Sequence, residues 1–166
     1  EELARSHFTY LADSAGEASV VLGDARISLE RELTAGRKQE FDALFVDAFS
    51  GDSIPIHLLT REAFALYFEH LKPDGVLAVH ITNLHIDLAD PVRNLAAAFG
   101  YAAFRVDHSP ESDDHHTYYS DWVLITKNEA FIQALESSAF LSAWDREVPK
   151  EIFWTDDYSN LFDVVF

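Results

Sequence analysis

The stretch that decides the fold runs from Phe41 to Asn83: "FDALFVDAFSGDSIPIHLLTREAFALYFEHLKPDGVLAVHITN". Two nearly all-apolar segments, at about 42–47 and 76–82, flank a helix that Thr60 caps. The helix carries one apolar stripe at helical spacing: Leu59, Ala63, Phe64, Tyr67, Phe68 and Leu71. Strands without a polar face are typical of a parallel sheet covered on both sides, so this strand–helix–strand unit predicts an α/β fold.

The rest of the chain continues the alternation of strands and helices. We expect further strands at about 18–22, 101–108 and 121–127, and further helices at about 3–11, 24–33, 90–99 and 128–144. Because the last two strands have no helix between them, we expect one antiparallel strand at an edge of the sheet. The sequence therefore predicts one α/β domain over residues 1–166, with a mostly parallel sheet and helices on both faces.

The composition excludes several classes of protein. The chain is 48% hydrophobic, as in a globular protein, has no cysteine and carries a formal net charge of −17. The missing cysteines rule out disulfides, thiolate metal sites and a cysteine nucleophile, and they are compatible with the cytoplasmic location that we expect. The charge argues against nucleic acid or an anionic membrane as a partner. No apolar run approaches the roughly 18–20 residues of a membrane helix.

The motifs of several large enzyme classes are absent. The chain contains no G-x-G-x-x-G, no G-x-x-x-x-G-K-[ST] and no G-x-S-x-G, so the common phosphate cradles and the hydrolase nucleophile elbow are unsupported. The first residues already have a helical pattern and contain no methionine. We therefore expect the chain to be the C-terminal part of a longer protein.

Polar residues stand near the ends of three predicted strands. Asp24, Asp47 and His80 each fall at or near such an end. In α/β sheets ligands bind beyond the carboxyl ends of the strands, so the pattern predicts a site there. Each residue also has a structural explanation: a turn or helix cap for the aspartates and a hydrogen-bonded core histidine for His80.

Two other segments rich in carboxylates were considered. Residues 113–116 read Asp-Asp-His-His, but adjacent loop residues rarely converge on one ion and no helical His-x-x-x-His spacing is present, so we expect no metal site. The segment from Trp154 to Tyr158 places two carboxylates between aromatic residues. It either folds over the site or holds the carboxyl terminus in place.

Four stretches of the chain resemble the spermidine synthase family. They are "VVLGDARISL", the stretch from Phe41 to Asn83 quoted above, "YSDWVLITK" and "WTDDYSN". The resemblance covers nearly the whole chain and is nearest to the spermidine synthase-like domains of bacteria. It implies the Rossmann-like fold of class I S-adenosylmethionine-dependent methyltransferases. It also implies transfer of an aminopropyl group from decarboxylated S-adenosylmethionine to a diamine such as putrescine.

The resemblance assigns roles residue by residue. Asp24 and Ala25 match the Gly-Asp-Gly/Ala segment that borders the adenine, and Asp47 matches the aspartate that faces the reacting amine. A carboxylate there can orient the amine and accept its proton as nitrogen attacks the carbon beside the sulfonium. We therefore expect Asp47 to be the base, with no metal and no prosthetic group.

The substrate loop departs from the family pattern. Three residues after the first aspartate the family has a second one, where this chain has Ser50, and the nearest aspartate, Asp52, is displaced by two. We expect Ser50, Asp52 and His80 to contact the substrate. The partners implied are a polyamine, a nucleoside and a second copy of the chain in a homodimer.

The resemblance also implies a gap in the sheet. The family's glycine-rich loop and the acidic residue that holds the ribose follow two strands that have no counterpart in this chain. In the family those strands lie between the ones expected here at 18–22 and 42–47. Backbone N–H and C=O groups left without partners in a sheet are energetically costly. We therefore expect one of three solutions: a longer chain supplies the missing strands, another chain supplies them, or residues 18–22 pair directly with residues 42–47.

Two other functions remain open on the same fold. One is a methyltransferase, although "SGDSIP" differs from the Asn-Pro-Pro-Tyr loop used on planar amines. The other is a non-catalytic descendant that binds a nucleoside or a polyamine, or that supports an attached membrane domain.

Overall fold

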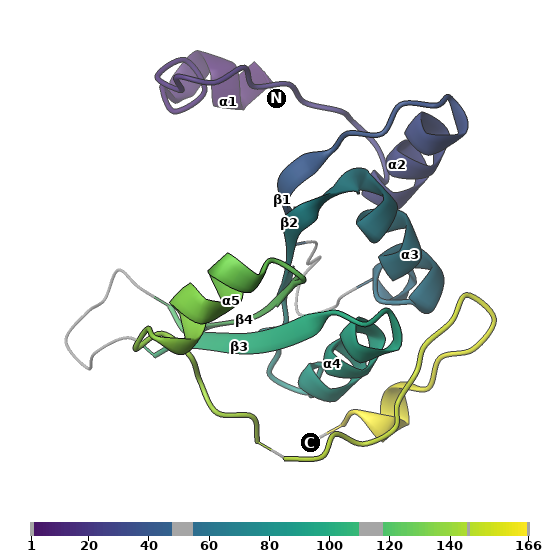
Figure 1. Ribbon diagram of the computed structural model, residues 1–166. Helices are drawn as coiled ribbons and strands as arrows, with labels where there is room; N and C mark the ends of the chain where they lie inside the picture. The colour runs from purple at the N-terminus through teal and green to yellow at the C-terminus, as the bar shows by residue number, and fades with distance from the viewer. Residues whose placement is uncertain (1, 48–54, 110–117, 146, 166) are drawn as a thin grey trace.

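The strand–helix–strand unit predicted from the sequence is present. The computed structural model describes residues 2–47, 55–109, 118–145 and 147–165. The unit consists of β1 (Phe41–Val46), the short 3-10 helix η1 (Ile56–Leu58), α3 (Arg61–His70) and β2 (Leu71–His80) (Figure 1). β1 and β2 pair in parallel, and Thr60 caps α3 through its side chain, as predicted.

The remaining elements follow the predicted order with two exceptions in length. They are α1 (Glu2–His7), α2 (Ala25–Thr34), α4 (Ala89–Ala98), β3 (Ala102–His108), β4 (Ser120–Thr126), α5 (Glu129–Glu136) and η2 (Leu161–Asp163). The first helix is shorter than the predicted 3–11. The helix predicted at 128–144 ends at Glu136, because the hydroxyls of Ser137 and Ser138 bond to its last carbonyls.

The four strands form one mixed sheet in the order β1-β2-β4-β3. β4 runs antiparallel to both of its neighbours, while the other three strands share one direction. The α/β class is confirmed, but the antiparallel strand does not lie at the edge as predicted. The inner place suits β4, whose apolar Val123 and Ile125 are completely buried there, whereas the side chains of β3 stay partly exposed.

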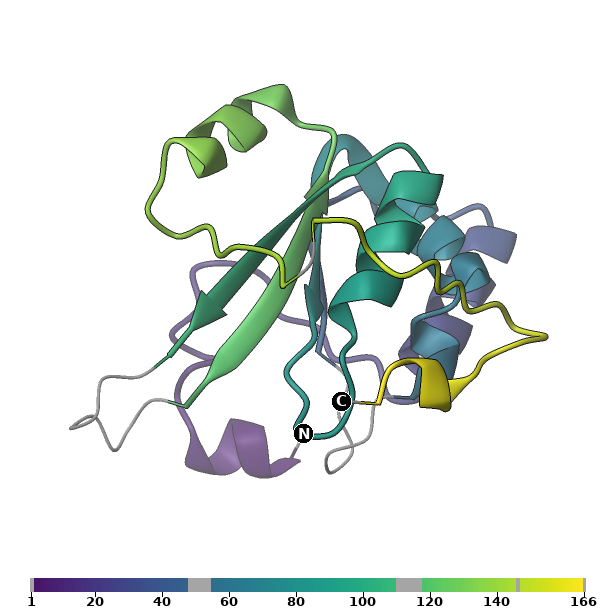
Figure 2. The ribbon, with the colours of Figure 1, turned by 90° about the horizontal axis from the view of Figure 1, so that it is seen from below.

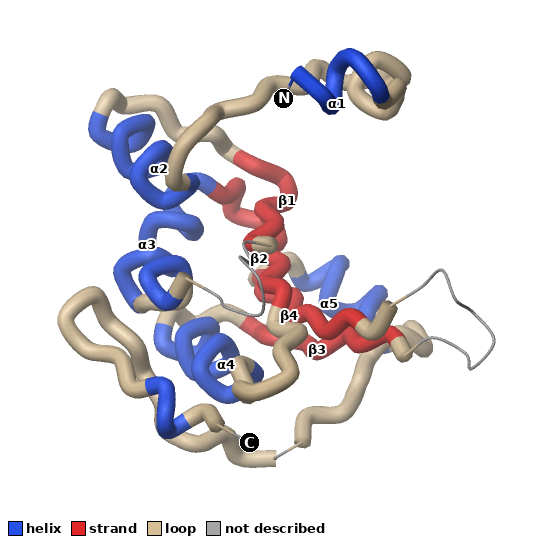
Figure 3. Tube along the Cα trace, turned by 180° about the vertical axis from the view of Figure 1, so that it is seen from behind, coloured by secondary structure: helices blue, strands red, loops and turns tan. Residues whose placement is uncertain are grey.

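Helices lie on both faces of the sheet, as predicted. α2, α3 and α4 occupy one side, and α5 lies on the other side, next to β3 and β4 (Figure 2). Buried side chains of the sheet, of α3 and α4 and of the C-terminal segment form the core, with these among its members: Phe64, Leu77, Val79, Val92, Leu95, Val123, Ile125 and Trp154. Figure 3 shows that β1 is the edge strand farther from α5.

The strand predicted at 18–22 is wrong. Residues 18–22 form no regular element, and Val21 and Leu22 are exposed by 67% and 79%. A β-branched run becomes a strand only when a neighbour supplies ladder hydrogen bonds, and the described residues put no strand on the outer side of β1. Direct pairing of 18–22 with 42–47, one of the three expected solutions to the gap, does not occur.

Gly75 fixes β1 against β2. A Cβ atom at this position would lie 2.9 Å from the carbonyl oxygen of Phe41 and 3.1 Å from that of Lys72. Only glycine permits this approach, which coincides with the register shift between Phe41 and Ala43. Gly75 and the residues from Lys72 onward belong to β2.

The C-terminal segment returns across the helices. The N–H of Arg61 donates to the carbonyl of Trp154, whose side chain is buried, and Val165 forms an isolated antiparallel bridge with Ile86. Among the described residues, no helix is both long and apolar enough to cross a membrane.

Candidate functional site

Asp47 and His80 meet where the two parallel strands end. Val46 is paired with Val79, so the residue after each lies at the same edge of the sheet. Asp47 Oδ1 and His80 Nδ1 are 2.7 Å apart, within hydrogen-bond distance. The side chain of Asp47 remains 55% exposed and that of His80 only 19%. Asp47 and His80, which the sequence predicted to lie at the ends of two strands, thus form one pair in which the carboxylate is the more exposed partner.

The imidazole of His80 is held on its flat side by Trp122. Because β4 is antiparallel, its first residues reach the same edge, and Trp122 is the register partner of His80. The two rings stack with centroids 4.6 Å apart and planes inclined by 16°, and Phe45 contacts Trp122 edge-on. This contact was not predicted, since it depends on a strand pairing that the sequence does not specify.

Thr82 holds the other ring nitrogen of His80. Its Oγ1 lies 2.6 Å from His80 Nε2 and accepts a hydrogen bond of 2.7 Å from the backbone N–H of Asp121. The side chain of Asp121 is buried against Arg105, whose Nη2 lies 2.8 Å from Asp121 Oδ2. Chiefly through this hydrogen bond, Asp121 raises the pKa of Arg105, so the guanidinium stays charged.

A small polar cavity adjoins these groups. It has a volume of about 140 Å³, and its lining includes Thr82, Arg105, Tyr119 and Asp121. Tyr119 donates from its hydroxyl to Asp121 at 3.2 Å, and burial raises the pKa of this phenol, so it stays a donor. The cavity is too small for a nucleoside, and Arg105 and Asp121 in its lining already pair with each other.

Asp24 heads a second aspartate–histidine pair. It caps α2 by accepting a hydrogen bond of 3.0 Å from the Ile27 N–H, while its other oxygen lies 2.9 Å from His57 Nε2. The hydrogen bond from Ile27, aided by His57, lowers the pKa of Asp24. The predicted cap is confirmed, and Ala25 is the first residue of α2. His57 was missed, although "IPIHLLT" places it one turn before the Thr60 cap.

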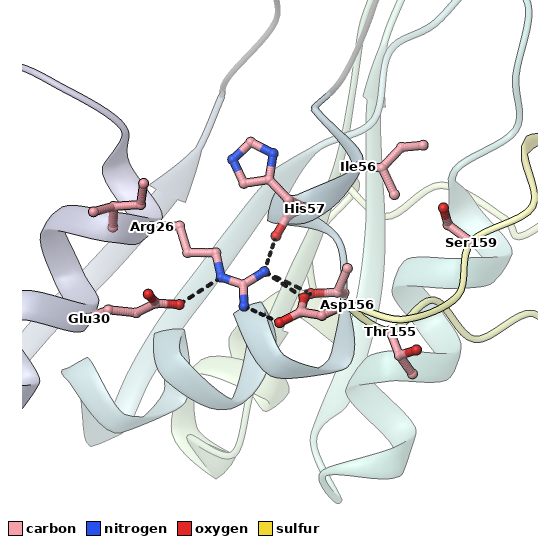
Figure 4. A pocket seen from close by; sticks show the side chains of 9 residues that line it. Arg26, Glu30, Ile56, His57, Thr155, Asp156 and Ser159 are labelled. Carbon is pink, nitrogen blue, oxygen red and sulfur yellow. Dashed lines mark hydrogen bonds and ion pairs between the residues drawn. The ribbon is translucent and has the colours of Figure 1, made fainter.

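Arg26 ties the C-terminal segment to α2 beside this pair. Its guanidinium makes two hydrogen bonds to the Asp156 carboxylate, one of 2.7 Å and one of 2.5 Å, and also contacts Glu30 and the carbonyl of His57 (Figure 4). Chiefly through its hydrogen bond, Arg26 lowers the pKa of Asp156. The aspartate therefore holds the carboxyl-terminal segment in place, one of the two roles considered for it.

A cavity of about 560 Å³ opens over this ion pair. Its lining includes Ile27, His57, Thr155 and Ser159. Figure 4 shows the last three of these around Arg26 and Asp156. Its volume would accommodate a small molecule. The guanidinium of Arg26, which lines the cavity, is already paired with Asp156 and Glu30. The polar groups that remain for a ligand belong mainly to the other lining residues.

The other predicted site residues are not placed. Ser50 and Asp52, and the acidic and histidine run at 113–116, lie outside the described residues. In the part of the chain that the structure describes, no group of three or more His, Asp or Glu side chains is arranged to hold a metal ion.

Part of the chain is similar in sequence to a known enzyme. No protein-family profile matches the chain. Over 59 residues it is 42% identical to a polyamine aminopropyltransferase of Vibrio vulnificus (strain CMCP6), a match that covers 35% of this chain and 19% of that protein.

Two solved structures have a similar fold. For the spermidine synthase from Thermotoga maritima the TM-score is 0.53 at 15% identity, covering 94% of this chain and 50% of that one. For a spermidine synthase in complex with the transition state analogue AdoDATO the TM-score is 0.51 at 14% identity, covering 94% and 49%. The chain therefore spans about half the length of these structures. It has the α/β fold of spermidine synthases and shares part of its sequence with a polyamine aminopropyltransferase, which confirms the resemblance recognised in the sequence.

Proposed function

We propose that this chain carries the amine-activating half of an aminopropyltransferase site of the spermidine synthase kind, with Asp47 as the base. The main support is the position of the Asp47 carboxylate. It lies at the joint end of two parallel strands, is more than half exposed, and has one oxygen held by His80. The sequence match to a polyamine aminopropyltransferase supports the same reaction class.

The chemistry requires a neutral amine beside an electrophilic carbon. A primary alkylammonium has a pKa of about 10.4, so at neutral pH its nitrogen has no free lone pair. Asp47 accepts a proton from the ammonium, and the freed lone pair attacks the methylene carbon next to the sulfonium sulfur of decarboxylated S-adenosylmethionine. The C–S bond breaks, its electron pair returns to sulfur, and methylthioadenosine leaves. The sulfonium is a good leaving group, so positioning and one base suffice.

The nucleoside is assigned to the Asp24 side of the domain. Asp24 and Ala25 would border the adenine, as the family resemblance implies. Each carboxylate oxygen can accept more than one hydrogen bond, so Asp24 can accept from an adenine amino group while it caps α2. Ser50 and Asp52 would contact the far end of the diamine. The cytoplasmic location and the homodimer stay predictions.

Calorimetry of the purified protein tests whether a donor site exists. The protein is titrated with methylthioadenosine, with S-adenosylmethionine and with putrescine. We expect methylthioadenosine to bind, and putrescine to bind more tightly once methylthioadenosine is present. Binding without turnover of the decarboxylated donor would favour the non-catalytic descendant, and methyl transfer from S-adenosylmethionine would favour the methyltransferase. Failure of both nucleosides to bind would contradict both enzymatic functions.

A further inference from the structure

We propose that Thr82 is a positioning residue that fixes the protonation of the His80 ring and thereby aims the Asp47 carboxylate at the amine. The catalytic role of Thr82 rests on the proposed function, whereas the hydrogen bonds themselves do not depend on it. It concerns a chain of four groups, which run from the backbone of β4 to the end of β1: Asp121 N–H, Thr82 Oγ1, His80 and Asp47.

The direction of the hydrogen bonds follows from the threonine hydroxyl. Thr82 Oγ1 accepts from the Asp121 N–H at 2.7 Å, which uses one lone pair and leaves the hydroxyl proton to be donated. His80 Nε2, at 2.6 Å, is in reach to accept it. The hydroxyl therefore donates to Nε2, and Nε2 carries no proton.

The proton of the neutral imidazole must then sit on Nδ1. A neutral histidine has one N–H and one bare nitrogen, and the hydrogen bond at one nitrogen decides the state of the other. Nδ1–H points at Asp47 Oδ1, 2.7 Å away, which is an acceptor when ionised. Every donor in this series of hydrogen bonds then meets an acceptor.

This arrangement suits a carboxylate that has to accept a proton. A neutral ring holds Oδ1 without placing a full positive charge beside it. An imidazolium would stabilise the carboxylate and so make it a weaker base. The second oxygen, Oδ2, is not used by this hydrogen bond and belongs to a side chain that is 55% exposed. Fixing one oxygen limits rotation of the carboxylate and directs the other toward the substrate.

The series of hydrogen bonds begins in the buried part of the sheet. Asp121 belongs to β4, and its own side chain is held by Arg105 through hydrogen bonds of 2.8–3.1 Å. Trp122, the next residue, stacks on the His80 ring. The exposed end at Asp47 is therefore positioned by groups that are themselves fixed.

The decisive experiment is ¹⁵N–¹H NMR of the histidine rings in the ¹⁵N-histidine-labelled protein, which separates the two neutral tautomers and the imidazolium. The His80 signals are assigned by their loss in His80→Gln. We expect His80 to be protonated on Nδ1 alone at neutral pH. Thr82→Val, which removes the hydroxyl and keeps the shape, loses the donor that keeps Nε2 unprotonated, so the imidazolium should appear beside the Nδ1–H tautomer, whereas Thr82→Ser should keep the state of the parent protein. A ring protonated on Nε2 in the parent protein, or a protonation state unchanged in Thr82→Val, would overturn the proposal.

Kinetics tests the catalytic meaning separately. Thr82→Val should lower kcat for aminopropyl transfer roughly tenfold with little change in the KM of the donor, and Thr82→Ser should recover most of it. His80→Asn, whose amide nitrogen can take the place of Nδ1, should retain more activity than His80→Ala. An unchanged kcat in Thr82→Val would overturn the positioning role. If the parent protein transfers no aminopropyl group, the proposed function fails, while the NMR result still decides the hydrogen-bond chain.

Discussion

The described residues contain two aspartate–histidine pairs, Asp47–His80 and Asp24–His57, and the pairs use their carboxylates differently. In the first, the histidine is mostly buried and the carboxylate is 55% exposed, with Oδ1 alone engaged by His80. In the second, one carboxylate oxygen accepts from the first turn of α2, the other faces His57, and the histidine is the more exposed partner. The first arrangement leaves a carboxylate exposed, as the proposed base requires, and the second uses its carboxylate to stabilise the start of a helix.

The largest expected effect is a loss of aminopropyl transfer when the aspartate of the first pair is changed. Asp47→Asn removes the proton acceptor while keeping the size of the side chain, so kcat for aminopropyl transfer should fall by roughly 10²–10⁴-fold. Asp42→Asn is the matched control, because Asp42 lies on β1, the strand that Asp47 follows, is largely exposed and pairs with Lys72 at the surface. A steady-state assay that found the same kcat in both variants would remove Asp47 from the mechanism.

The next effect concerns how β1 is held beside β2. Gly75→Ala places a Cβ atom 2.9 Å from the carbonyl oxygen of Phe41, so the two strands must shift apart. We expect a loss of about 2 kcal/mol in the free energy of unfolding, measured by urea denaturation. The shift should weaken the Asp47–His80 contact, which spans both strands. Gly16→Ala, where the nearest atom is 3.8 Å away, should change stability little, and equal losses in the two variants would contradict this explanation.

A smaller effect tests the structural role of the second pair. Asp24→Ala removes the cap of α2 and should lower the free energy of unfolding by about 1 kcal/mol. Asp24→Asn should cost less, since asparagine is an equally good capping residue. Thermal unfolding of both variants measures the difference. If alanine were tolerated as well as asparagine, the cap would contribute nothing and the contrast between the pairs would fail.

The smallest effect appears in acid. The pKa of Asp24 and that of Asp156 both lie below the ordinary value of 3.8, chiefly through hydrogen bonds from Ile27 and Arg26 respectively. Folded-state values below the unfolded ones mean that the stabilisation is complete above about pH 4 and is lost as pH falls through the lowered values. Unfolding measured between about pH 5 and pH 2 should therefore show a shallower decline in Asp156→Asn than in the parent protein. A parallel decline would show that the Arg26–Asp156 pair does not contribute.

The sequence predicted the βαβ unit well because its signals are local. Apolar strands, a striped helix and the Thr60 cap each depend on neighbouring residues, and the ends of parallel strands share an edge. That rule was enough to bring Asp47 and His80 to one place, and the family resemblance supplied the proton-accepting role.

What the sequence could not supply depends on pairing between distant segments. Thr82 and Trp122 join His80 only because β4 enters the sheet next to β2, which the spacing of the last two strands does not specify. The segment 18–22 was predicted as a strand for the opposite reason: its composition is strand-like, but no described strand offers it a ladder. His57 meets Asp24 through the fold of η1, which has no sequence signal of its own.

The central claim is that Asp47 serves aminopropyl transfer, and product analysis tests it most directly. The purified protein is incubated with decarboxylated S-adenosylmethionine and putrescine, and the products are quantified by mass spectrometry. The account predicts equal amounts of methylthioadenosine and aminopropylated diamine from the parent protein and from Asp42→Asn, and almost none from Asp47→Asn. The absence of both products from the parent protein, or equal yields from Asp47→Asn, would contradict it.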